Sequence, residues 1–176
     1  MAKDFESIAT LTGNGTAQTL SFTSIPGTYQ HLQIRGVART ARAGVNNDGM
    51  FCYFNGDTND DANYISHVFD GDGTNVTSGG TKNNGVYCRL TVITGANAAS
   101  NIMGVFVCDI LDYANTNKNK VTRTFGGNNR QTSGGDVRLA SGLWINTNTI
   151  TSITIWNNNN SAFTSDTRIA LYGIKG

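Results

Sequence analysis

Residues 166–176, DTRIALYGIKG, decide the fold class. Ile169 and Leu171 fall on one face of an extended chain, whereas Arg168 and Tyr172 fall on the other. This alternation, with a period of two residues, is typical of a β-strand with one buried face. The strand runs almost to the last residue, so we expect a compact body without an appended tail, linker or second module.

Short segments of the same kind recur along the chain, separated by turn residues such as TGNG at 12–15 and SIPG at 24–27. Nowhere do apolar residues keep a helical spacing for three turns. We expect irregular structure at 40–49, 70–85 and 126–136, which are rich in Gly and Asn. The predicted strands are 5–11, 16–23, 30–39, 50–54, 64–69, 86–94, 102–113, 120–125, 137–144, 150–156 and 168–174.

This pattern predicts an all-β fold: an antiparallel β-sandwich of about ten strands, of jelly-roll type, forming a single domain over residues 1–176. The segment 102–113, IMGVFVCDILDY, is nearly all apolar. Such a strand is either covered on both faces or lies at a subunit contact.

The composition limits the partners of the chain. Charged residues make up 14% and the formal net charge is +1, so no overall field attracts nucleic acid or an anionic membrane. No apolar run approaches the roughly 20 residues that span a bilayer. The N-terminal residues lack the apolar core and cleavage site of a signal peptide. We therefore expect synthesis in a cytoplasm, with no nucleic acid and no membrane as partner.

The three cysteines, Cys52, Cys88 and Cys108, each lie in an apolar, strand-like segment. Their number is odd and no two of them form a C-x-x-C pair. We expect buried free thiols, in preference to a disulfide or a metal site.

Two acidic loops have features of calcium sites. The loop DTNDD at 57–61 carries oxygen atoms at alternate positions, but an EF-hand needs Gly at its sixth position and Glu at its twelfth, where this chain has Ala62 and Val68. The loop DGDG at 70–73 is first of all a turn. We expect both to be turns in which Asp and Asn side chains bond their own backbone, and we predict no metal and no cofactor.

No set of residues identifies a catalytic site. The two histidines, His31 and His67, follow no nucleophile motif, and we expect them to form local hydrogen bonds. Glu6 is the single glutamate, so the carboxylate pair of a glycosidase would have to consist of aspartates. We predict a protein without enzymatic activity.

Several segments, taken in their order along the chain, resemble the sequence pattern of one protein family. They are 22–29 (FTSIPGTY) with 31–35 (HLQIR), 54–57 (FNGD), the Tyr64/His67 pair, 109–118 (DILDYANTNK), 141–144 (SGLW), 151–155 (TSITI) and 170–175 (ALYGIK). Together, and in this order, they resemble a family of tailed-bacteriophage virion proteins found in cyanophages and other marine phages. The resemblance extends over nearly the whole chain.

The resemblance implies a non-enzymatic β-sandwich protein on the virion. Two roles are open: a capsid decoration (cement) protein that binds the major capsid protein on the outer head surface, or a tail- or fibre-associated module that binds a receptor or a glycan. The chain shows no stalk, heptad or collagen-like repeat, which favours the decoration protein. A homotrimer would cover the sheet edges and match the local symmetry of a capsid.

Six residues are candidates for contacts with a neighbouring subunit or a capsid: Arg39, Arg42, Tyr113, Lys118, Trp144 and Trp156. Each also has a simpler interpretation. The basic residues belong to a solvated face, and Tyr113 packs at the edge of the core. Trp144 and Trp156 each occupy a core position in a strand that is covered on both faces. Trp156 is in addition a candidate platform for stacking a sugar ring.

Overall fold

The computed structural model describes residues 4–58, 63–130 and 134–176, and every regular element in them is a β-strand. Eight strands form one antiparallel sheet in the order β1-β12-β3-β8-β9-β10-β5-β6, and four form a second in the order β2-β11-β4-β7. In chain order the strands are β1 (Phe5–Thr12), β2 (Leu20–Phe22), β3 (His31–Ala38), β4 (Asn47–Phe54), β5 (Tyr64–Gly71), β6 (Val76–Gly85), β7 (Cys88–Thr94), β8 (Gly104–Leu111), β9 (Lys120–Asn129), β10 (Gly135–Trp144), β11 (Ile153–Asn157) and β12 (Arg168–Ile174).

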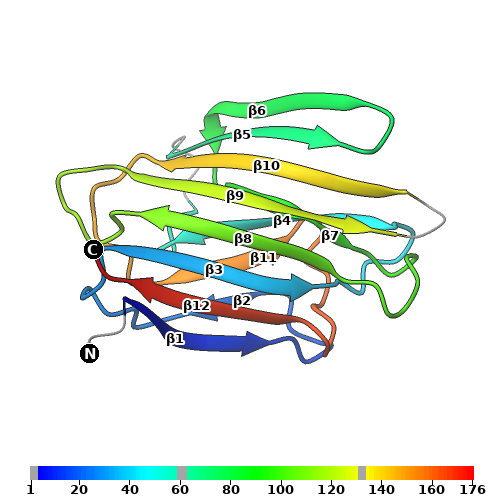
Figure 1. Ribbon diagram of the computed structural model, residues 1–176, viewed down its shortest axis with the longest axis horizontal. Helices are drawn as coiled ribbons and strands as arrows, with labels where there is room; N and C mark the ends of the chain where they lie inside the picture. The colour runs from blue at the N-terminus through cyan, green and yellow to red at the C-terminus, as the bar shows by residue number, and fades with distance from the viewer. Residues whose placement is uncertain (1–3, 59–62, 131–133) are drawn as a thin grey trace.

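The two sheets pack face to face, and in Figure 1 the large sheet lies in front of the small one. The expected antiparallel β-sandwich is confirmed, with twelve strands instead of about ten. The jelly-roll arrangement is not confirmed, because the strands divide into eight and four, whereas a jelly roll is an eight-stranded double sheet. Among the described residues, no helix is long and apolar enough to cross a membrane.

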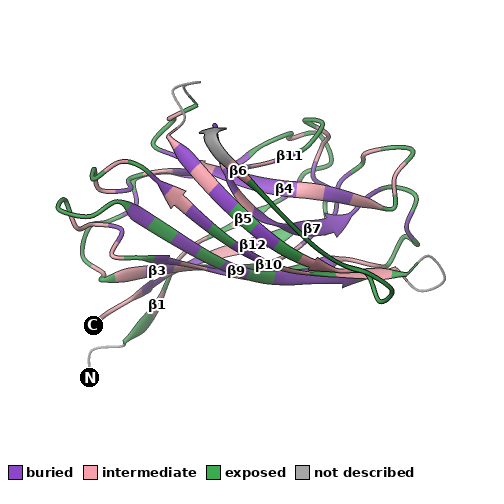
Figure 2. Ribbon diagram, turned by 90° about the horizontal axis from the view of Figure 1, so that it is seen from above, coloured by how far each residue is buried: buried purple, intermediate pink, exposed green. Residues whose placement is uncertain are grey.

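The C-terminal strand β12 has the alternation that its sequence predicts. Ile169 and Leu171 are fully buried, whereas Arg168 is exposed. The strand lies between β1 and β3, and its buried side chains belong to the one core between the two sheets. Figure 2 shows the same alternation of buried (purple) and exposed (green) residues along the strands of the large sheet. Burial of one such aliphatic side chain contributes about 1.5–3 kcal/mol. The period-two pattern therefore fixes which face of the large sheet is internal.

Three aromatic rings fill the core between β4, β5 and β10. The ring centroid of Phe54 lies 5.6 Å from that of Trp144 and 6.2 Å from that of Tyr64. The indole N–H of Trp144 donates to the Asp57 carboxylate at 2.7 Å, and the Tyr64 hydroxyl donates to the Asp57 carbonyl oxygen at 3.1 Å. Both polar groups thus have partners, which offsets the cost of burying them.

The three cysteines are free and buried, as predicted. Cys52 and Cys88 are direct cross-strand partners on β4 and β7. Burial is the main cause that raises the pKa of the Cys108 thiol to about 12. Because the thiolate is the reactive and metal-binding form, Cys108 acts as a small apolar side chain at neutral pH.

Strand β6 is the element that the sequence did not predict, because we expected 70–85 to be irregular. It is an edge strand that pairs with β5 alone, and residues 72–80 are all exposed. A strand without a buried face has no alternation of apolar and polar residues to reveal it. Strands β9 and β10 also extend further, to Asn129 and from Gly135, than their apolar residues indicate, because the added residues at 126–129 and 135–136 are Gly, Asn and Asp.

A buried arginine holds the loop between β7 and β8. The guanidinium of Arg39 donates to four backbone carbonyl oxygens, those of Ala96 at 3.2 Å, Ala98 and Ala99 at 2.6 Å each, and Ile102 at 3.0 Å. None of these partners is a carboxylate, so carbonyl dipoles compensate for the desolvation of the cation. Arg39 thereby fixes the path of the loop.

We predict that Arg39→Met lowers the free energy of unfolding by about 3 kcal/mol, because four carbonyl groups lose the guanidinium as a donor at once. Methionine keeps much of the apolar stem, so the loss reports the hydrogen bonds more than a cavity. Urea unfolding followed by tryptophan fluorescence measures the effect.

The matched control is Arg123→Met, because the Arg123 side chain is 74% exposed. It should change the free energy of unfolding by about 0.5 kcal/mol or less. Equal effects of the two substitutions would contradict the structural role of Arg39.

Candidate binding surfaces

The first candidate surface lies on the side of the large sheet that points away from the small sheet. Two neighbouring rows of cross-strand partners on β5, β10, β9 and β8 carry apolar side chains there. These side chains, which we call the outer apolar face, are Phe69, Val105, Val107, Phe125, Val137 and Leu139. Five of the six expose 50–55% of their surface, and Val107 is half-buried. Soluble monomers rarely expose large apolar side chains in one contiguous patch, so this face has the character of an interaction surface.

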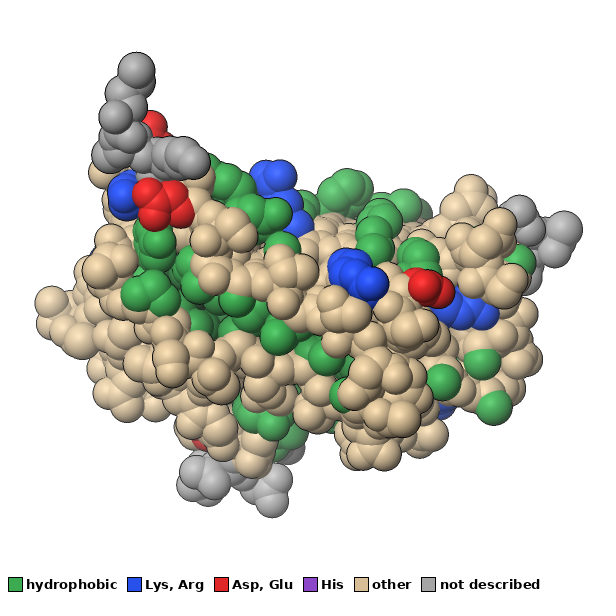
Figure 3. Space-filling view, turned by 90° about the horizontal axis from the view of Figure 1, so that it is seen from below, with side chains coloured by type: hydrophobic (Ala, Val, Ile, Leu, Met, Phe, Trp, Pro, Cys, Tyr) green, Lys and Arg blue, Asp and Glu red, His purple; other side chains and the backbone are tan. Residues whose placement is uncertain are grey.

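A shallow hollow of about 1050 Å³ lies over part of this face, above β3, β8, β9 and β10. Gly127 lies in its floor, opposite Val105 on one neighbouring strand and Val137 on the other. A Cβ atom at this position would come within 2.1 Å of the carbonyl oxygen of Asp136, so only glycine fits. In Figure 3 this side of the sheet forms the upper margin of the molecule, where hydrophobic side chains stand with Lys and Arg side chains between them.

Cations outnumber anions on this side of the large sheet. Arg35, Arg123 and Arg168 are exposed there, and Asp109 on β8 is the one carboxylate among the described outward positions of β3, β8, β9, β10 and β12. Three arginines against one aspartate give a formal charge of +2. Asp109 pairs with Arg123 at 2.9 Å, which leaves the excess positive charge at Arg35 and Arg168.

Arg35 connects the outer apolar face to the β1 edge of the sheet. Its guanidinium carbon lies 5.1 Å from the ring centroid of Phe5 and 5.9 Å from that of Tyr172. The two rings are stacked with their centroids 4.7 Å apart. Cation–π contact of this kind orients the arginine while its charge stays available to solvent or to a partner.

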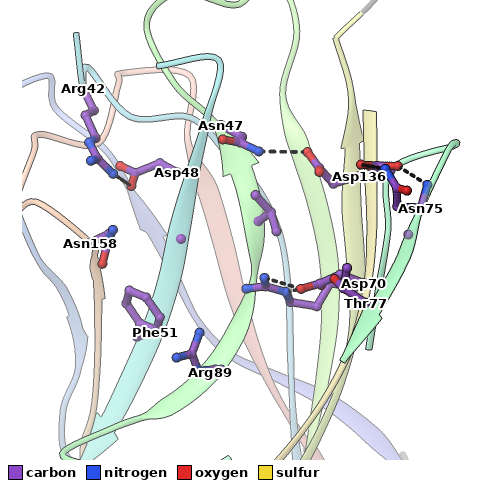
Figure 4. Close-up of a pocket in the computed structure, with 15 residues that line it drawn as sticks. Arg42, Asn47, Asp48, Phe51, Asp70, Asn75, Thr77, Arg89, Asp136 and Asn158 are labelled. Carbon is purple, nitrogen blue, oxygen red and sulfur yellow. Dashed lines mark hydrogen bonds and ion pairs between the residues drawn. The ribbon is translucent and has the colours of Figure 1, made fainter. Parts of the chain in front are cut away.

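The second candidate surface is a polar cleft on the opposite side of the large sheet. It has a volume of about 390 Å³ and lies between β4 and β7 of the small sheet and β5, β6 and β10 of the large sheet (Figure 4). This volume is in the range of small-ligand sites, about 300–1,000 Å³. Its charged and amide side chains are Arg42, Asn47, Asp48, Asp70, Asp72, Asn75, Arg89, Asp136, Arg138 and Asn158.

Carboxylates fix two of the three arginines in this cleft. Nε and Nη2 of Arg138 donate to the two oxygens of Asp70 at 2.6 and 2.7 Å. Nη1 of Arg42 donates at 2.8 Å to Asp48, which is buried and whose other oxygen accepts the Thr40 hydroxyl at 2.9 Å. Bidentate and charge-assisted bonds hold these groups in one orientation, so the walls of the cleft are formed before any ligand binds.

The third arginine, Arg89, has no side-chain partner among the described residues, and its Nε atom is buried. Arg89 is the cross-strand partner of Phe51, whose ring centroid lies 4.4 Å from that of Tyr87 and 5.1 Å from that of Trp156. The indole N–H of Trp156 is also buried without a partner. Arg89 is therefore the cation of the cleft that remains available to an anion.

Three of the six interface candidates from the sequence are internal. Arg39, Tyr113 and Trp144 are buried, with exposures of 7%, 0% and 1%. Arg39 holds a loop and Trp144 fills the aromatic core, while the Tyr113 hydroxyl donates to the carbonyl oxygen of Pro26. Buried side chains offer no surface to a partner, so these three residues have structural roles in place of the predicted interface role.

Of the other three, Lys118 lies apart from Arg42 and Trp156. Lys118, in the loop between β8 and β9, has its Nζ atom 2.7 Å from the Asp112 carboxylate. Arg42 lines the polar cleft, and Trp156 is half-buried against Phe51 beside it. The structure thus does not bring the six candidates together, and a partner contact through Lys118 stays a prediction.

The acidic loop at 70–73 and His31 have hydrogen-bond partners among the described residues. Part of the loop at 57–61 lies outside the described residues. Asp72 accepts the backbone N–H of Asn75 at 2.6 Å, and such backbone bonds lower the pKa of Asp72, as expected of an Asx turn. Nδ1 of His31 accepts the backbone N–H of Asp112 at 3.0 Å, so its bond joins two distant segments of the chain and is not the local bond predicted for it.

The sequence carries a signal for the outer apolar face, most clearly at 102–113. In that segment both faces are apolar, and Val105 is indeed exposed on the outward side. The neighbouring strands repeat the pattern with Phe125 and Leu139 at outward positions. Apolar residues at outward positions of several strands, taken together, would have identified the surface.

No protein-family model matches the sequence, and no curated protein matches it. Among solved structures, the carbohydrate-binding module CBM40 of a Ruminococcus gnavus sialidase bound to α2,3-sialyllactose is 11% identical over 92% of this chain and 96% of that chain, with a TM-score of 0.30. The eqolisin-family peptidase SCP-B in complex with a tripeptide is 7% identical over 80% of this chain and 63% of that chain, with a TM-score of 0.13. At such TM-scores neither neighbour assigns a ligand or an activity to this chain.

A pH dependence of stability follows from Asp109. Partial burial acts to raise the pKa of Asp109, but hydrogen bonds from Gln33 and Arg123 outweigh it, so the pKa is lowered. The folded-state pKa then lies below the unfolded value of about 3.9. The resulting stabilisation is present above that value and is lost as the pH falls through the folded-state pKa.

We predict that the free energies of unfolding of the wild type and of Asp109→Asn differ most at about pH 6, and that this difference becomes smaller below about pH 4. Urea unfolding at a series of pH values measures both proteins. A difference that is the same at all pH values would show that Asp109 gains nothing from its charge.

Proposed function

We propose that this protein is a non-enzymatic structural component of a bacteriophage virion. In this proposal it is a capsid decoration protein that binds the major capsid protein on the outer surface of the head. Binding to the assembled shell and not to free capsid subunits would stabilise the shell by mass action. The family resemblance of the sequence supports the virion, and the exposed apolar face supports the mode of binding.

The observation that carries this proposal is the outer apolar face. Phe125 is 55% exposed and Leu139 is 50% exposed, and they are direct partners on adjacent strands in the middle of the sheet. Aromatic and aliphatic side chains at the centre of a flat surface, with arginines at its rim, are the composition of a protein–protein interface. A rigid sheet also offers such a surface without a loss of backbone entropy on binding.

The charges at the rim indicate the chemistry of the partner. If a second copy of this chain covered the face, Arg35 and Arg168 of both copies would lie on one small interface, and like charges brought together there cost several kcal/mol. A partner with an apolar centre and carboxylates around it fits better. We therefore assign the face to a heterologous partner, the capsid surface.

Self-association into a homotrimer, which we also propose, then has to use another part of the molecule. Strand β6 is an edge of the large sheet and pairs with β5 alone. An unpaired edge is a place where strands of neighbouring subunits can add to a sheet. In this arrangement the trimer would form through the sheet edges while the outer apolar faces contact the shell.

Co-sedimentation of the protein with capsids that lack it tests the proposed binding surface. We predict that Phe125→Asp weakens capsid binding about 30-fold or more, because it places a charge in the apolar centre at a cost of about 2 kcal/mol or more. Ile145→Asp is the matched control, since Ile145 is 43% exposed in the loop after β10 and outside the face. Equal capsid binding by wild type and Phe125→Asp would contradict the assignment of the face.

The location on the particle is tested separately. A density map of the purified virion should show the sandwich over the capsid at local symmetry axes. Density at the tail alone would contradict the decoration protein and favour the receptor- or glycan-binding module.

A further inference from the structure

The polar cleft has features that capsid binding does not use. It lies on the inner side of the large sheet, at the inward positions of Asp70, Asp136 and Arg138, whereas the outer apolar face lies on the other side. A protein docked through the outer face would therefore leave the cleft open to solvent. Its volume of about 390 Å³ accommodates a ligand of one or two sugar rings.

The arginine that has no partner points to an anionic ligand. Arg42 and Arg138 already donate to Asp48 and Asp70, and their strongest bonds are therefore committed. Arg89 has a planar group of five donors with no acceptor among the described residues. A half-buried guanidinium without a partner is costly, and a carboxylate bound in bidentate fashion would remove that cost.

The remaining walls indicate which anion fits. Three of the four aspartates in the cleft are paired with arginines, Asp48 with Arg42, Asp70 with Arg138 and Asp136 with Arg130. This leaves one cation, Arg89, beside one further carboxylate, Asp72, so a monoanion is matched better than a dianionic phosphate. The same aspartates accept hydrogen bonds from hydroxyl groups. The amides of Asn47, Asn75 and Asn158 both donate and accept. A ligand with a single carboxylate and several hydroxyl groups satisfies both sets of partners.

We propose that this cleft binds the sugar-acid residue of an acidic glycan, with its carboxylate on Arg89 and its hydroxyl groups on the surrounding aspartates and asparagines. Phe51 is the cross-strand partner of Arg89 and packs against Tyr87 and Trp156, so this aromatic cluster fixes the strand next to the one that carries Arg89. The site gives the particle a weak affinity for acidic polysaccharide. It does not depend on where the protein lies in a virion, so it can fail while the capsid assignment holds, and the reverse.

Titration of the isotopically labelled full chain with D-glucuronate, followed by amide chemical shifts, tests the site. We expect saturable shifts at Arg89 and at the asparagines of the cleft with a dissociation constant on the order of 1 mM, typical of one small ligand with few bonds. D-glucose, which has the hydroxyl groups without the carboxylate, should bind at least about tenfold more weakly. Glucuronate shifts that do not exceed those of glucose would overturn the proposal, as would tighter binding of inorganic phosphate than of glucuronate.

Two variants locate the carboxylate. Arg89→Gln should weaken glucuronate binding about tenfold or more, because it removes the charged donor of the carboxylate. Arg123→Gln, on the outer side of the sheet, should bind glucuronate as the wild type does. Equal binding by Arg89→Gln and wild type would overturn the role of Arg89. Since the comparison of glucuronate with glucose uses the unaltered chain, it decides the ligand class even if a variant folds poorly.

Discussion

The unequal size of the two sheets is the constraint on which the rest of the structure depends. An eight-stranded sheet packs against a four-stranded one, so the small sheet covers one face of the large sheet and only part of its width. The described chain has no other layer to cover the outer side, where apolar residues are left exposed. At the β5–β6 end the large sheet extends beyond the small one, and polar residues line the inner side of this extension. Both candidate surfaces follow from this mismatch.

The sequence predicted the fold where side chains alternate. Strand β12 shows this best, because Ile169 and Leu171 are buried as their spacing indicates. It could not predict β6, whose residues 76–80 are exposed and whose pairing depends on backbone hydrogen bonds to β5. Nor could it show that two basic residues are internal. Arg39 and Lys120 are buried and donate to backbone carbonyl groups, which belong to a distant loop for Arg39 and to the preceding loop and Thr147 for Lys120.

The polar cleft could not be predicted as a site, because its residues come from five strands and from loops that meet only in the folded molecule. A partial signal was present. Asp70 and Arg138 occupy inward positions, in phase with Val68 on β5 and with Ala140 on β10. Charged residues at inward positions of two strands predict either an ion pair or a polar cavity, and here both are found.

Hydroxyl-radical footprinting of intact particles tests the central claim most directly, because it reports the solvent exposure of individual side chains. The account predicts that Phe69, Phe125 and Leu139 are strongly labelled in the free protein and protected on the virion, while Ile145 is labelled in both. Equal labelling of these three residues in the free protein and on the virion would contradict it, because the outer apolar face would then be exposed on the particle.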